Sequence, residues 1–269
     1  MDTLSQASLL NLWEAGRPLH PLDRGLLAVE ATAAESATAV ADWPLGRRNR
    51  ALAELHATVF GRRLRGWTEC RGCGERLEFG VDAMALADRG ATEGEQHITF
   101  SERRYRLPTS RDLAALAAES SSESGSESVA DLAARRLVQR CCLATEPEAG
   151  QREASETEPA LSETDIDAIG EQMAAADPLA EILLHFDCPA CSASFEEGLD
   201  LGSFLWAEIE RQPCACCATC IPWLRPTGGA NWRFWRLLPP AARRTSTWCR
   251  RDGLSAAHRR RGHPARAKA

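Results

Sequence analysis

The sequence almost lacks lysine, because Lys268 is the only one against 31 arginines. A Walker-type phosphate loop, a kinase-type lysine and a Schiff-base lysine are therefore excluded from residues 1–267. Three further signatures are missing: the Gly-x-Ser-x-Gly elbow, the His-Glu-x-x-His helix and the Gly-x-Gly-x-x-Gly turn. We therefore expect neither an enzyme nor a protein that takes a small-molecule substrate.

Long apolar runs are also missing. No run approaches the roughly 20 residues that a membrane helix needs, so we expect no membrane association. The first residues, Met1 to Gln6, carry no basic segment followed by an apolar core, as an export signal would. We expect a cytoplasmic protein with reduced thiols rather than an extracellular disulfide framework.

Basic charge is scarce in most of the chain. Residues 1–212 hold 20 basic and 37 acidic residues, a net charge of -17, whereas residues 213–269 hold 12 basic residues and one acidic residue. Nucleic-acid phosphates need compensating basic groups. We therefore do not expect the main body to bind nucleic acid.

What the chain does contain is a pair of matching segments, Cys70 to Asp82 and Cys188 to Asp200, which align without a gap. Each begins with Cys-x-x-Cys and ends with Gly, an apolar residue and Asp. One Cys-x-x-Cys turn places two thiolates on a metal ion, and a second turn completes a closed tetrahedral shell. We predict one structural zinc ion held by Cys70, Cys73, Cys188 and Cys191.

The residues around each Cys-x-x-Cys turn, or knuckle, alternate apolar and polar side chains as half-buried strands do. We therefore predict a β-hairpin at each knuckle, and the two hairpins together would form one split zinc ribbon. A thioredoxin-like redox motif is the alternative interpretation, but such a motif opens a helix rather than a strand. We expect Trp67, just before the first knuckle, to cover the metal site.

These patterns predict an α+β fold made of six segments: a helical N-terminal module (1–62), the first knuckle hairpin with a second hairpin and a helix (63–118), a Ser/Glu-rich linker (119–128), a helical segment with an acidic loop (129–177), the second knuckle hairpin with a helix (178–212) and an irregular tail (213–269). Zinc binding would tie the middle of the chain to its far end and contribute to folding.

Several local features refine this picture. Ser110 is the predicted N-cap of the helix that follows Pro108, and Ser162 with Asp165 has the spacing of a capping box. Gly61 is the predicted left-handed cap of a helix over residues 45–60. Three arginines near the start of that helix are predicted to face solvent: Arg47, Arg48 and Arg50. Cys141 and Cys142 are adjacent and cannot chelate together, so we interpret them as core or near-core cysteines on a helix.

The character of the chain changes at Pro213. Five of the 11 cysteines and four of the eight tryptophans follow it, without periodicity. A second metal-binding cluster is one interpretation. A shifted reading frame is the other, because residues 213–237 read two bases later can encode an amphipathic helix, a glycine turn and a second helix. We favour a frameshifted or disordered tail, preceded by a helix over residues 201–211.

Six stretches together resemble one family: Leu12 to Glu14, His20 to Arg24, Leu45 to Arg50, Cys70 to Cys73, Arg106 to Leu113 and Cys188 to Cys191. The chain resembles, over residues 5–212, the cysteine-bearing baseplate proteins of phage-tail-like contractile injection systems, which are similar to baseplate hub assembly chaperones of contractile-tailed phages. From Pro213 onward the sequence departs from the family pattern.

The resemblance implies a structural or chaperone-like assembly role, with other baseplate or hub proteins as partners and incorporation into a tail-like particle as an outcome. The alternative is a zinc-ribbon protein that binds nucleic acid, such as a transcription accessory factor. Acidic residues around the knuckles argue against it, since phosphate contacts favour Arg or Lys. A metal-dependent hydrolase ranks third, because it needs an open coordination position.

Overall fold

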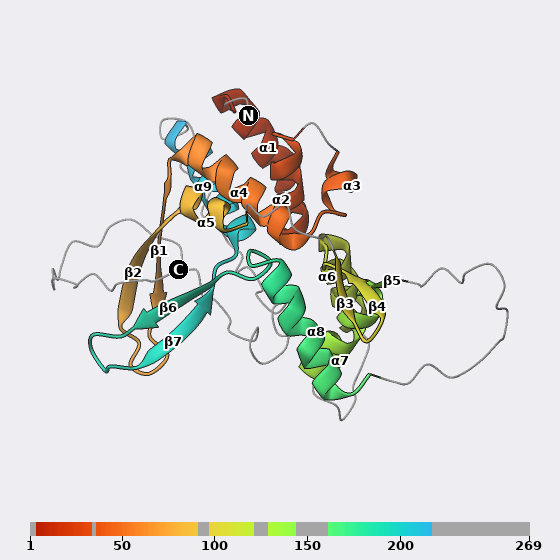
Figure 1. Cartoon of the computed structure of the whole chain (residues 1–269). Coiled ribbons are helices and arrows are strands. Elements are labelled where there is room, and N and C mark those ends of the chain that lie inside the picture. The colour runs from red at the N-terminus through yellow and green to blue at the C-terminus, as the bar shows by residue number, and fades with distance from the viewer. Residues whose placement is uncertain (1–3, 34–35, 91–96, 121–128, 144–160, 217–269) are drawn as a thin grey trace.

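The computed structural model describes residues 4–33, 36–90, 97–120, 129–143 and 161–216 (Figure 1). Along the chain the elements are α1 (Gln6–Gly16), α2 (Pro21–Glu30), α3 (Ala37–Val40), α4 (Leu45–Phe60), β1 (Arg63–Glu69), β2 (Arg76–Asp82), α5 (Ala83–Arg89), β3 (His97–Phe100), β4 (Arg103–Arg106), α6 (Ser110–Ser120), α7 (Val129–Cys141), β5 (Cys142–Leu143), α8 (Glu163–Ala176), β6 (Leu183–Asp187), β7 (Ser194–Gly198) and α9 (Leu201–Cys216). The predicted mixture of helices with small hairpins is confirmed.

Within the described residues, most buried apolar side chains belong to two hydrophobic clusters. The larger cluster joins α1, α2, α4, α5 and the hairpin β1–β2 to β6, β7 and α9, and we name residues 4–90 with 179–211 the ribbon region. The smaller cluster joins β3 and β4 to α7 and α8, and we name residues 97–176 the inserted region. In sequence, the inserted region separates the two halves of the ribbon region. In Figure 1 the helices α1, α2, α4 and α9 lie at the top, the paired hairpins at the lower left and the inserted region at the lower right.

The sheets that the structure describes are small and antiparallel. Strands β1 and β2 pair from Arg63 with Asp82 to Glu69 with Arg76. Strands β6 and β7 form a shorter hairpin, and β3, β4 and β5 form a three-stranded sheet in that order. Such hairpins are marginal alone, so each depends on the helices and on its neighbour for stability.

Local sequence explains several helix starts. The capping box predicted at α8 is confirmed, because the Asp165 N–H donates to Ser162 Oγ at 3.2 Å and the Ser162 N–H donates to Asp165 Oδ2 at 2.9 Å. At α6 the prediction was one residue off: Ser110 is already helical. Thr109 precedes it, and its N–H and hydroxyl both donate to Asp112 Oδ2.

Two helix ends also differ from expectation. Gly61 has φ +93° and ψ 164°, an extended conformation open to glycine but outside the left-handed helical region. Helix α9 continues through Pro213 to Cys216, beyond the predicted end at Arg211. The frameshift hypothesis concerns a tail whose residues from 217 onward lie outside the described residues, so it stays a prediction. The linker was predicted over residues 119–128, but residues 119 and 120 belong to α6, and residues 121–128 lie outside the described residues.

The start of α4 forms a joint with the inserted region and with the residues that directly follow it. The Leu45 N–H donates to the carbonyl oxygen of Pro108 at 3.0 Å. The Gly46 N–H donates to Asp177 Oδ2 at 2.8 Å, so a carboxylate from 131 residues away caps this helix. Burial raises the pKa of Asp177. Asn49 completes the joint, because its Nδ2 donates to the carbonyl oxygen of Leu179 at 2.7 Å.

The prediction that all three arginines at the start of α4 face solvent is wrong for Arg48, which lies at this joint. Arg48 is half-buried and donates to Ser110 Oγ at 2.9 Å and to Asn49 Oδ1. Burial lowers its pKa, while Asp200 and Asp177 act in the opposite direction. Arg48 therefore connects α4 to the inserted region.

Candidate metal centre

The two knuckles have the same backbone turn. In the first, the Cys70 N–H donates to the carbonyl oxygen of Glu75, and the Gly74 N–H donates to that of Cys70, both at 2.8 Å. In the second, the Cys188 N–H donates to Ala193 and the Ser192 N–H donates to Cys188, both at 2.9 Å.

The residue after the second cysteine of each knuckle has a positive φ, 74° at Gly74 and 59° at Ser192. Glycine adopts this conformation freely, whereas serine does so at a cost in conformational energy. The gapless alignment of the two segments thus reflects one repeated local structure.

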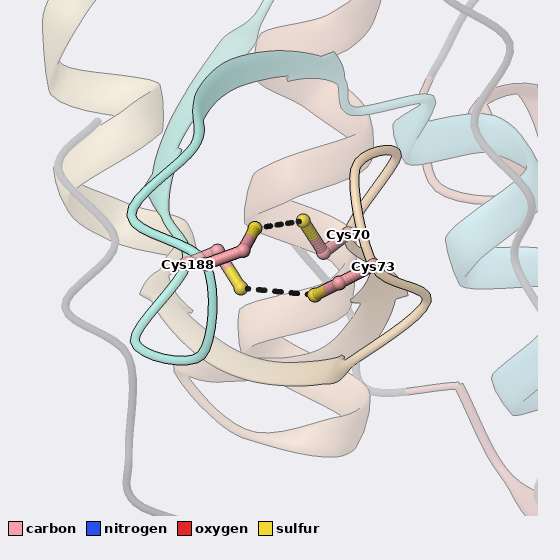
Figure 2. Close-up of side chains that lie close together, drawn as sticks. Cys70, Cys73 and Cys188 are labelled. Carbon is pink, nitrogen blue, oxygen red and sulfur yellow. Dashed lines mark hydrogen bonds between the residues drawn. The ribbon is translucent and has the colours of Figure 1, made fainter.

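The structure brings all four predicted ligand residues together. Their four sulfur atoms, from Cys70, Cys73, Cys188 and Cys191, lie within 4.8 Å of one another. The Sγ atoms of Cys70 and Cys191 are 3.6 Å apart, as are those of Cys73 and Cys188. Figure 2 shows Cys70 and Cys73 on one turn facing Cys188 on the other.

These distances suit a tetrahedral metal shell. With metal–sulfur bonds of about 2.3 Å, the edges of the tetrahedron are about 3.8 Å long. A disulfide bond would require about 2.05 Å, and all four cysteines are free thiols. The cluster is therefore sized to hold one metal ion.

The electrostatics of the cluster point the same way. The hydrogen bond from the Gly72 N–H lowers the pKa of Cys70 to about 7. The Glu75 N–H acts in the same direction at Cys73, but the neighbouring sulfurs, with Cys191 first, and desolvation raise the pKa of Cys73 to about 12. Four thiolates at this spacing repel one another, and a bound divalent cation would offset that repulsion.

Apolar packing supports the two hairpins behind the sulfurs. Phe79 of β2 meets Phe186 of β6 edge to face, with ring centroids 5.6 Å apart. Phe186 in turn stacks on Phe195 of β7 at 5.5 Å. Aromatic pairs of this kind contribute about 0.5–1.5 kcal/mol beyond the area they bury. The hairpins therefore have a shared core besides the thiol cluster.

An ion pair also links the hairpins, and the sequence reasoning missed it. Arg71, inside the first knuckle, lies 2.8 Å from Glu197 Oε2 on β7, and the Glu197 side chain is only 4% exposed. Glu197 occupies a strand position between the buried residues Phe195 and Leu199. Strand alternation around Phe195 and Leu199 was the available signal, because a glutamate at an inward position requires a partner.

Trp67 does not have the predicted place over the sulfurs. It lies on the face of β1 opposite the buried residues Leu64 and Thr68. The guanidinium of Arg76 stacks over its ring, with the Cζ atom 4.3 Å from the ring centroid. This tryptophan therefore forms part of the outer face of the hairpin.

Cys141 and Cys142 lie outside the cluster. Cys141 ends α7 and is buried in the core of the inserted region, where desolvation raises its pKa to about 12. Cys142 begins β5 and is exposed. The interpretation of Cys141 as a core cysteine on a helix is confirmed, whereas Cys142 belongs to a short strand.

No protein-family model, curated protein or solved structure matches this chain. Over the part of the chain that the structure describes, none of the helices combines the length and apolar character needed to cross a bilayer.

Proposed function

We propose that the four-cysteine cluster binds one Zn2+ ion that serves as a structural tie. The observation that carries this proposal is the convergence of four sulfurs within 4.8 Å from hairpins more than a hundred residues apart. A tetrahedral set of four thiolates selects zinc or iron among the common biological metals. With all four positions occupied by protein, the ion stabilises the fold and has no site for a substrate.

Metal analysis of the full-length protein tests this. We expect one zinc per chain after purification under reducing conditions, and loss of that zinc in Cys191→Ser. Cys142→Ser is the matched control and should retain the metal. An iron-containing protein with visible thiolate absorption, or a metal-free protein that remains folded, would refute the zinc proposal.

We further propose that the protein is a non-enzymatic structural or assembly factor of the baseplate of a contractile phage tail-like particle, acting in the cytoplasm or within the particle. The support is that the resembling stretches supply framework contacts. Leu45 to Arg50 holds the joint with Asp177, and Arg106 pairs with the buried Asp112 at 2.6 Å. These contacts stabilise one conformation of the protein, and a partner protein would recognise that conformation.

Helix α8 offers the kind of acidic face that a partner protein would use. Glu163, Asp167 and Glu171 are exposed at four-residue intervals, and this helix contains no basic residue. Side chains at this spacing lie along one side of a helix. We propose that the partners are other baseplate or hub proteins with complementary basic surfaces.

The assembly role is tested in the organism that encodes the chain. We expect its gene beside genes for sheath, tube and spike proteins. We also expect the purified protein to form a stable complex with one of the neighbouring baseplate gene products in size-exclusion chromatography. Unrelated neighbouring genes, or no complex with any baseplate protein of the cluster, would count against the role.

A gel-shift titration addresses the alternative function. A nucleic-acid-binding ribbon should bind DNA or RNA with an affinity that falls steeply as salt is raised. Glu69, Glu75 and Glu78 lie around the first hairpin and oppose phosphate binding there. We expect no shift at physiological salt.

A further inference from the structure

The four cysteines of the cluster differ in their exposure to solvent. Cys70 and Cys188 are each 2% exposed, whereas Cys73 and Cys191 are exposed. Both sulfur–sulfur contacts of 3.6 Å join a buried cysteine of one hairpin to an exposed cysteine of the other, Cys70 with Cys191 and Cys188 with Cys73. Each exposed cysteine thus has a buried partner across the hairpin interface.

We propose that this cluster is a peroxide-reactive modification site, in which oxidation replaces the metal tie by two cross-hairpin disulfides, Cys70–Cys191 and Cys73–Cys188. The inference rests on the metal-binding role proposed above. It extends that role, because the same four residues would connect the hairpins in both a metal-bound and an oxidised state.

The chemistry is balanced with hydrogen peroxide as the oxidant. The thiolate of Cys191 attacks one peroxide oxygen, the O–O bond breaks, and the products are the sulfenic acid of Cys191 and hydroxide. The thiolate of Cys70 then attacks the sulfenic sulfur, forms the S–S bond and expels a second hydroxide. Two sulfurs supply the two electrons that peroxide accepts. Cys73 and Cys188 react likewise with a second peroxide, and the metal ion leaves with its charge unchanged.

Two features favour linkage across the hairpins over linkage within a knuckle. Each knuckle is closed by its own pair of backbone hydrogen bonds, such as those between Cys70 and Glu75 and between Gly74 and Cys70. The aromatic contacts at Phe186 and the pair of Arg71 with Glu197 do not use the metal. These contacts keep the hairpins adjacent during the oxidation itself, so the opposite sulfur at 3.6 Å stays within reach of the sulfenic acid.

Peptide mapping of the full-length protein tests the linkage. Zinc content is measured first, and the protein is then treated with hydrogen peroxide while zinc release is followed with a chromogenic chelator. Remaining thiols are blocked at acidic pH before digestion without reductant. Trypsin separates Cys70 from Cys73 by cleavage after Arg71, and a protease that cleaves before aspartate releases residues 187–199.

We expect peptides 66–71 and 72–76 each to be joined to peptide 187–199, with fragmentation assigning Cys191 to the first link and Cys188 to the second. Joining of 66–71 to 72–76, a disulfide confined to 187–199, links to cysteines beyond Pro213, or sulfinic acids without disulfides would each overturn the proposal. Cys142→Ser is the matched control and should give the same map.

The two proposals fail separately. A purified protein without zinc refutes the structural-zinc proposal, whereas the map after oxidation decides the linkage whatever the metal content. A second measurement covers stability: the oxidised protein should keep amide-exchange protection in β1–β2 and β6–β7 that the chelated, reduced protein loses. Equal loss of protection in the oxidised protein and in the chelated, reduced protein would contradict a disulfide link between the hairpins.

Discussion

The ribbon region and the inserted region both contain antiparallel hairpins and cysteines, yet the cysteines have different roles. In the ribbon region, a hydrogen bond from the Gly72 N–H lowers the pKa of Cys70 to about 7, and three other sulfurs lie close by. In the inserted region, desolvation raises the pKa of Cys141 to about 12, and the residue packs as a small apolar side chain. The paired Cys-x-x-Cys spacing thus brings four thiols together where a metal ion could bind, whereas Cys141, next to Cys142 in sequence, packs in a core.

The regions also differ in how they balance buried charge. The inserted region pairs Arg106 with Asp112, whose side chain is 1% exposed, whereas the zinc proposal assigns the charge of the thiol cluster to a cation from outside the chain. We therefore expect the two regions to respond independently to loss of the metal and to loss of the ion pair.

Metal removal should have the largest effect. Structural zinc sites contribute about 10–16 kcal/mol of apparent binding free energy, so a strong chelator or Cys188→Ser should unfold the paired hairpins. Hydrogen exchange should show lost protection in β1–β2 and β6–β7, with protection retained in β3–β4 and α7. Simultaneous loss in both regions would show that they unfold as one unit.

The Asp112→Asn substitution should have the next largest effect, confined to the inserted region. It leaves Arg106 without its buried ionic partner, and breaking a buried pair in this way costs about 3 kcal/mol. Urea unfolding measures the change. The control is Asp42→Asn, because Asp42 pairs with Arg111 at an exposed position, where such pairs contribute about 0–1 kcal/mol.

The same pair predicts a pH dependence. Burial opposes ionisation of Asp112, but hydrogen bonds from Arg106 and Thr109 dominate and lower its pKa below the ordinary value. Its contribution is therefore complete above the unfolded-state pKa of about 3.9 and is lost as pH falls through the lower folded-state pKa. The stability difference between wild type and Asp112→Asn should shrink below pH 4, and a constant difference would contradict this.

A smaller effect is expected at the joint between the regions. A Cβ atom added at Gly46 would lie 1.6 Å from Asp177 Oδ1, so that carboxyl would have to move. Gly46→Ala should therefore destabilise the protein by about 2 kcal/mol, a typical cost of overpacking. Thermal unfolding measures it, and an unchanged midpoint would show that the joint accommodates the methyl group.

The smallest expected effect has the opposite sign. Gly170 lies on the exposed face of α8, and no atom lies within 4 Å of an added Cβ. Gly170→Ala should stabilise the protein by about 0.5–1 kcal/mol, because alanine loses less backbone freedom in a helix. This substitution is the matched control for Gly46→Ala.

Local sequence patterns were sufficient to predict many of the helices and hairpins of this fold. The repeated Cys-x-x-Cys segments with alternating flanks predicted both hairpins, and the spacing of Ser162 and Asp165 predicted the start of α8. Such signals involve neighbours in sequence. They also indicated which four cysteines to group, because two knuckles have the right ligand number for one closed shell.

What escaped prediction depends on partners that are distant in sequence. Arg48 looks like a solvated helix residue until Ser110 approaches it. In the sequence, Asp177 is only the residue that ends a helix. In the structure its carboxylate accepts a hydrogen bond from the Gly46 N–H and so caps the start of α4. Glu197 is also buried against a distant partner, because Arg71 lies 126 residues earlier in the sequence. Charge burial is decided by tertiary contacts, and local periodicity does not encode those contacts.

The separation of the knuckles has a consequence for synthesis on the ribosome. The sulfur contacts span 115 and 121 residues, which take roughly 6–24 s to translate at about 5–20 residues per second. During that interval the nascent chain exposes two thiolates with half a coordination shell. Closure of the ribbon region therefore waits until Cys191 has left the exit tunnel, and the inserted region has time to fold first.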